Sequence, residues 1–159
     1  DINGTFEFQS VNGKFTNRQK DVYNAVLRVM KAATQMLVPG NFLHEYHTQV
    51  GLLMEKELIG LGLISQDDVD NQNPEWPAYK KYFMHGTSHY LGLDVHDVGS
   101  WTTPIEAGMV FTCEPGIYIP EENLGIRLEN DVLVTNSGPN DLMGSIPLEA
   151  DEIEALMAK

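Results

Sequence analysis

The spacing of apolar residues changes along this chain, and that change constrains the fold more than any other feature. Up to residue 61 the apolar residues recur every three or four positions, which predicts two amphipathic helices at about 17–37 and 44–61. Thr16 and Gln19 form a capping-box pattern at the start of the first helix, and Pro39-Gly40 stops it. After residue 83 the pattern becomes strand-like. Helices followed by strands predict an α+β domain.

Short apolar or alternating runs predict the strands of a curved antiparallel sheet. They lie at 109–113, 116–119 and 127–135. A further strand is expected at 5–11, before a hairpin turn at Asn12-Gly13. Residues 65–82 are predicted to be a polar loop with at most one short turn, and 149–157 a final helix. We therefore expect a curved sheet with flanking helices.

Charge and composition exclude several classes of protein. The net charge of −13 argues against a nucleic-acid binder, which needs a positive surface for phosphates. No run of about 18 apolar residues is present that could cross a membrane. The single cysteine, Cys113, excludes an intrachain disulfide and is compatible with a reducing compartment, so we expect a cytoplasmic protein.

Three of the five histidines, His85, His89 and His96, fall within twelve residues, and the carboxylates Glu114 and Glu129 follow. Imidazoles and carboxylates are the ligands of hydrolytic metal centres. Each residue also has a simpler interpretation: the histidines could be core or surface residues, and His96 could pair with Asp97 on the surface.

The two glutamates differ in how strongly they indicate a site. Glu114 ends an apolar run, where a carboxylate is costly unless it is paired or bound to a metal. Glu129 shares a strand face with Arg127, so the pair is either a plain salt bridge or an arginine that orients a metal ligand. Asp1 alone indicates nothing. His44 and His47 are expected on a helix surface and Cys113 in the core, without a role.

Four motifs in order resemble the aminopeptidase P and prolidase branch of the pita-bread (creatinase/aminopeptidase) metallopeptidases. The first is the hairpin and helix start at 11–16. The second runs from His85-Gly86 through Ser88-His89 to His96-Asp97-Val98-Gly99, and the others are Thr112-Cys113-Glu114-Pro115-Gly116 and Gly125-Ile126-Arg127-Leu128-Glu129. The resemblance implies the pita-bread fold, of which residues 1–159 would be the C-terminal portion. The first half of the fold and one aspartate ligand would then lie upstream.

The resemblance also implies a dinuclear site. His89, Glu114 and Glu129 match three of its ligands and Asp1 matches a fourth. Two divalent ions, Mn²⁺ first and Co²⁺ or Zn²⁺ otherwise, would hold a bridging hydroxide that Glu114 orients. His96 would stabilise the developing oxyanion, His85 would position substrate or move a proton, and Arg127 would hold Glu129 or the substrate.

The implied activity is hydrolysis of an N-terminal Xaa-Pro bond. The implied partners are a peptide with proline in second position and either a second copy of the protein or its upstream part. A prolidase, which cuts only dipeptides, has nearly the same motifs. Methionine aminopeptidase fits the stretch from His96 to Gly99 less well. A non-catalytic binding module on the same fold is a fourth interpretation.

Overall fold

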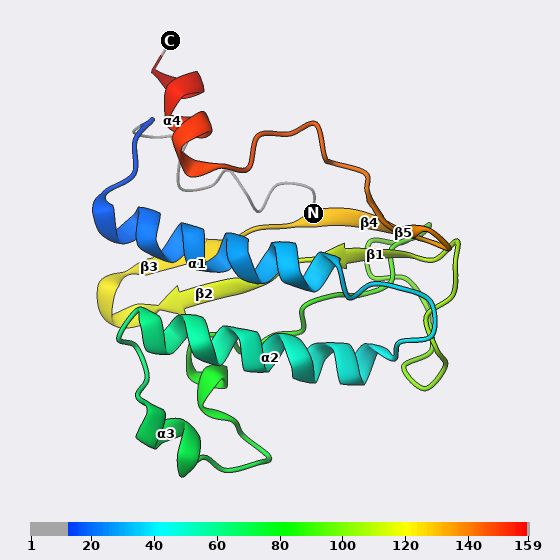
Figure 1. The fold of residues 1–159 in the computed structure, drawn as a ribbon, viewed down its shortest axis with the longest axis horizontal. Coiled ribbons are helices and arrows are strands. Elements are labelled where there is room, and N and C mark those ends of the chain that lie inside the picture. Colours follow the sequence, from blue (N-terminus) through cyan, green and yellow to red (C-terminus); the bar gives the residue numbers. More distant parts are fainter. Residues whose placement is uncertain (1–12, 159) are drawn as a thin grey trace.

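The computed structural model describes residues 13–158, in which helices come first and antiparallel strands follow (Figure 1). Helix α1 spans Asn17–Thr34 and helix α2 spans Leu43–Gly60, so both predicted long helices are confirmed. The capping box of Thr16 and Gln19 is also confirmed, with both of its hydrogen bonds present. Helix α1 ends three residues before the predicted boundary because the amides of Met36 and Leu37 bond three residues back, as in a tightened last turn.

The segment between α2 and the strands is more ordered than the sequence indicated. It holds a short helix α3, Gln66–Asp70, and a 3₁₀ turn η1, Ala78–Lys81. Ser65 and Asp68 form a capping box at the start of α3, which is a signal that the loop prediction overlooked. Helix α4, Ala150–Met157, confirms the predicted final helix.

Five strands follow η1, and they form two sheets. Strands β1 (Val110–Cys113), β4 (Asn130–Thr135) and β5 (Gly138–Asp141) make one sheet in the order β1-β4-β5. Strands β2 (Gly116–Ile119) and β3 (Leu124–Arg127) make the other, connected by the 3₁₀ turn η2 (Pro120–Glu122). All pairs are antiparallel, so the α+β prediction is confirmed.

The predicted single strand at 127–135 is wrong, because it breaks at Leu128–Glu129. The partner strand carries Pro115 opposite the break, and proline has no N–H to donate to a ladder. Only the amide of Leu128 bonds across, to the carbonyl of Pro115 at 3.2 Å. Strand β5 was not predicted. It turns back directly after β4, from Thr135 to Gly138, where Gly138 has a φ of +120°.

Helices α1 and α2 run side by side, α1 lies in front of the strands, and the core lies between α1 and the sheets (Figure 1). Residues that α1 buries include Val22, Val26 and Met30, while the strands contribute Phe111 and Ile117. Within residues 13–158 no helix is both long and apolar enough to span a membrane. The predicted strand at 5–11 and the site residue Asp1 lie outside the described residues.

Candidate metal centre

Three of the sequence-predicted ligands, His89, Glu114 and Glu129, lie together. One ligand atom of each residue lies within 4.8 Å of the other two. The Nε2 atom of His89 is 3.5 Å from Oε1 of Glu114, and both side chains are 15% exposed. The cluster is therefore compact and largely shielded from solvent.

The backbone brings His89 to this place. Residues 87–91 run along the free edge of β1: the amide of Thr112 donates to the carbonyl of His89 at 3.1 Å, and the amide of Glu114 donates to that of Thr87 at 2.8 Å. The hydroxyl of Thr112 also accepts the His89 amide at 3.1 Å. These bonds fix His89 beside the end of β1, where Glu114 follows.

The two carboxylates face each other across a break in the ribbon. Strand β1 pairs Cys113 with Asn130, and β2 pairs Gly116 with Arg127. The same register runs through both sheets, so it sets Glu114 opposite Glu129. Like charges directly opposite each other destabilise a sheet, and a bound cation would remove that repulsion.

Hydrogen bonding fixes which nitrogen of His89 is free. Its Nδ1 lies 2.8 Å from the carbonyl oxygen of Tyr90. A carbonyl can only accept, so Nδ1 carries the proton and donates it. In the neutral imidazole Nε2 then presents a lone pair to Glu114, as a metal ligand must.

Glu129 is buried without adequate partners. Its side chain is 3% exposed, and Oε2 has no hydrogen bond within the described residues. Arg127 approaches Oε2 only to 3.7 Å through Nη2. Burial and the nearby charge of Glu114 raise the pKa of Glu129. An orphaned buried oxygen, a second carboxylate and an imidazole lone pair form a donor set that fits a divalent cation.

His85 lies near this cluster but bonds elsewhere. Its Nδ1 donates to the carbonyl of Gly86 at 2.8 Å, so Nε2 accepts from the hydroxyl of Tyr118 at 2.9 Å. Burial raises the pKa of Tyr118 and keeps its hydroxyl protonated. Sequence reasoning missed Tyr118, although its spacing of two from Gly116 and four from Glu114 suggests the same strand face.

His96 comes from an exposed loop and lies over His89, with 4.3 Å between the ring centroids. Arg127 contacts Glu129 as the shared strand face predicts, and no hydrogen bond to its buried Nε lies within residues 13–158. The structure thus gathers His89, His96, Glu114, Glu129 and Arg127. It also places His85 beside this group, where the hydroxyl of Tyr118 hydrogen-bonds the His85 ring.

Helix α2 supports the segment that carries the histidines. Tyr46 and Ser88 share a buried hydrogen bond of 2.9 Å between their hydroxyls. His47 Nδ1 lies 3.2 Å from the hydroxyl of Thr87, so the expectation of a surface His47 is wrong. His47 is half-buried, and burial lowers its pKa. Cys113 is fully buried in the core, as expected.

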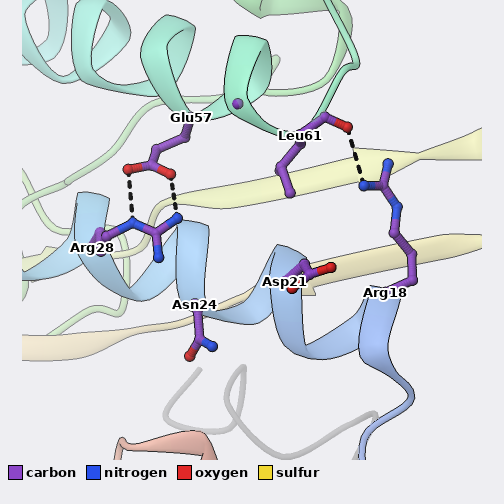
Figure 2. A pocket seen from close by; sticks show the side chains of 7 residues that line it. Arg18, Asp21, Asn24, Arg28, Glu57 and Leu61 are labelled. Carbon is purple, nitrogen blue, oxygen red and sulfur yellow. Dashed lines mark hydrogen bonds and ion pairs between the residues drawn. The ribbon is translucent and has the colours of Figure 1, made fainter.

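A separate pocket lies between α1 and α2, and Figure 2 shows its lining. Arg28 is paired there with both carboxylate oxygens of Glu57, at 2.9 and 2.6 Å. Arg18 donates to the carbonyl of Leu61 at 3.1 Å and to Glu122. Both guanidinium groups therefore have partners within the protein, and they connect α1 to α2 and to η2.

The chain is similar to known metallopeptidases. The family model described as metallopeptidase family M24 matches residues 1–136. A Xaa-Pro aminopeptidase of Haemophilus influenzae is 41% identical over 99% of this chain, which spans 38% of that relative. Intermediate cleaving peptidase 55 of Saccharomyces cerevisiae is 37% identical. That match covers 92% of this chain and 29% of the length of the yeast protein.

A solved structure, zinc-substituted E. coli aminopeptidase P in complex with product, matches with a TM-score of 0.82 and 39% identity. The match covers 92% of this chain and 36% of the E. coli protein. The chain therefore spans between 29% and 38% of the length of these relatives. The match confirms the expected α+β, pita-bread architecture and the resemblance to the aminopeptidase P branch.

Proposed function

Because this chain belongs to metallopeptidase family M24, we propose that it carries the metal-binding part of an aminopeptidase that hydrolyses N-terminal Xaa-Pro bonds. The cluster of His89, Glu114 and Glu129 is the observation that carries the proposal. Its imidazole has a free lone pair, and its buried carboxylate has an oxygen without a partner. Specificity for Xaa-Pro rests on the similarity to Xaa-Pro aminopeptidases.

We assign four residues of this chain to a pair of divalent ions. His89, Glu114 and Glu129 form the described part of the ligand set, and Asp1 is proposed as a further ligand from its motif. The family resemblance implies one further aspartate ligand, which would complete the proposed set. Carboxylate-rich ligation with one imidazole suits Mn²⁺, and also Co²⁺ or Zn²⁺. When bound, the ions would polarise the scissile carbonyl and lower the pKa of the attacking water.

The side chains of the chain itself perform the proton and charge handling. Glu114, whose side chain is 15% exposed beside His89, accepts the proton of the attacking water. His96, which is exposed and lies over His89, donates a hydrogen bond to the developing oxyanion. Arg127 holds the charge of Glu129, and His85 with Tyr118 positions the substrate.

A prolidase remains the second candidate, because its motifs are nearly the same. The two activities differ in substrate length. Tripeptides with proline in second position are cleaved by an aminopeptidase P, whereas a prolidase accepts only the dipeptide. A non-catalytic module would cleave neither peptide.

Substitution of His89 by alanine tests the proposal. The intact protein is loaded with Mn²⁺, its metal content is measured by mass spectrometry, and hydrolysis of Xaa-Pro-Xaa and Xaa-Ala-Xaa peptides is followed. We expect cleavage only of the proline peptide, and loss of both metal and activity in His89→Ala. His44→Ala, on the exposed surface of α2, is the matched control. Normal cleavage by the His89 variant would overturn the proposal.

A further inference from the structure

The loop at residues 92–100 carries His96 and has little core to hold it. It contains no helix or strand, and most of its residues are exposed. Leu93 and Val98 are among the most exposed apolar side chains of the described chain, at 104% and 89%. Because burial cannot fix this loop, other contacts must hold His96 over His89.

The carboxylate of Asp97 ties the loop together. Its Oδ2 accepts the amide of Leu93 at 2.9 Å, and its Oδ1 accepts the amide of Val98 at 2.8 Å. The two bonds close the backbone on both sides of His96. Within residues 13–158 Asp97 makes no ion pair with His96, the surface pairing considered from the sequence, and bonds backbone amides instead.

Two glycines allow this closure. A Cβ at Gly92 would lie 1.8 Å from Oδ2 of Asp97, closer than any real contact. A Cβ at Gly99 would lie 2.1 Å from the ring of Tyr90. A side chain at either site would force Asp97 or Tyr90 to move from its present position.

Tyr90 joins the loop to the segment that holds His89. Its carbonyl accepts the amide of Asp97 at 3.1 Å, and its hydroxyl donates to the carbonyl of Ser100 at 2.8 Å. The same Tyr90 carbonyl also accepts Nδ1 of His89. One backbone oxygen thus contacts both His89 and the residue that follows His96.

We propose that Asp97 is a positioning residue that acts through His96: its carboxylate closes the 92–100 loop so that the His96 imidazole lies over His89. The activity readout of this inference rests on the proposed peptidase function. The structural readout does not, since the hydrogen bonds of Asp97 can be followed without any substrate.

The first test compares Asp97→Ala with Asp94→Ala in the intact protein. Both variants remove one carboxylate from the same loop, but within residues 13–158 the Asp94 side chain has no hydrogen bond. We expect Asp97→Ala to lower kcat/KM about tenfold to a hundredfold, mainly through kcat, because misplacing a transition-state contact by about 1 Å costs that much. Asp94→Ala should stay within about twofold of the wild type. Both variants should keep their full metal content.

A double-mutant cycle separates positioning from general damage. In a His96→Ala background, Asp97→Ala should cost no more than about twofold further, because the residue it positions is already gone. Gly92→Ala should lower kcat/KM as Asp97→Ala does. It should cost little in the Asp97→Ala background, because the atom left at 97 is a Cβ at 3.5 Å from the new methyl group. Independent, multiplying losses would overturn the inference.

Hydrogen exchange supplies the readout that does not depend on activity. In metal-free protein the amides of Leu93 and Val98 should exchange faster in Asp97→Ala than in the wild type. Their exchange rates in Asp94→Ala should equal those of the wild type. Equal exchange in all three proteins, or full activity of Asp97→Ala, would overturn the role of Asp97. If the wild type cleaved no Xaa-Pro peptide, the proposed function would fail, and the exchange comparison would still decide whether Asp97 closes the loop.

Discussion

Glu129→Gln should stabilise the metal-free protein. The Glu129 side chain is 3% exposed, and one of its oxygens has no hydrogen bond in the described part of the chain. Arg127 lies too far away, at 3.7 Å, to make a short ion pair, and Glu114 adds a like charge. Glutamine keeps the volume and removes the charge, so no cavity forms. An unsatisfied buried group costs about 1–3 kcal/mol, and more when it is charged. Glutamine keeps a buried polar group but removes its charge, so we expect the free energy of unfolding to rise by about 1 kcal/mol.

Divalent metal should reverse this order of stability. A ligand that binds only the folded state adds about 2.7 kcal/mol at a concentration of 100 times its Kd. The wild type should gain that amount in Mn²⁺, whereas Glu129→Gln, which lacks one ligand charge, should gain much less. The variant should therefore be the more stable protein in EDTA and the less stable one in Mn²⁺.

Urea unfolding followed by circular dichroism measures both quantities, with the slope against urea expected to stay constant. Glu152→Gln, an exposed change on α4, is the control and should leave stability unaltered.

The dependence of stability on pH supplies a further check. Because the folded pKa of Glu129 is raised, the folded state binds the proton more tightly. The difference in unfolding free energy between Glu129→Gln and the wild type in EDTA should therefore shrink as the pH falls toward 4.5. A Glu129→Gln protein that is less stable than wild type in EDTA would refute the reasoning.

Three further predictions follow from other parts of the molecule. Thr16→Ala removes the N-cap of α1 and should lower the free energy of unfolding by about 1 kcal/mol in urea titrations, while Thr48→Ala on the exposed face of α2 should cost less. Tyr118→Phe removes the donor to His85 and should lower kcat/KM on Xaa-Pro-Xaa peptides about tenfold with an unchanged urea midpoint; an unaltered rate would contradict that role. Cys113 is fully buried with a pKa of about 11, so iodoacetamide should modify it only as fast as the protein unfolds, and rapid alkylation of the folded protein would count against the structure.

The helices could be predicted from the sequence because their signals are local. The periodicity of α1 and the pair Thr16 and Gln19 lie within the element that they specify. The break at Leu128–Glu129 could not, since alternation continues through it and its cause, Pro115, lies on the partner strand. Strand β5 was missed because its four residues, Gly-Pro-Asn-Asp, are typical of turns, and only its pairing with β4 identifies it as a strand.

The candidate site likewise has residues that the sequence indicated and residues that it did not. His89, Glu114 and Glu129 were grouped by motif, and their proximity agrees with that grouping. Tyr118 hydrogen-bonds His85, and Asp97 hydrogen-bonds amides of its own loop. These contacts depend on the folded backbone, so they could not be predicted from residue type and spacing. His47 was misjudged because the partner that draws it inward, Thr87, is forty residues away.

The proton on Nδ1 of His89 is held by a main-chain oxygen, that of Tyr90. Every residue type has this carbonyl, so no single amino-acid replacement at position 90 can delete the acceptor. A point mutation at position 90 therefore cannot remove the group that sets the tautomer of His89. A histidine oriented by an aspartate side chain, in contrast, loses its acceptor when that aspartate is replaced. In a saturation-mutagenesis screen scored by metal retention, position 90 should tolerate many replacements, and the intolerant positions should be the ligands themselves.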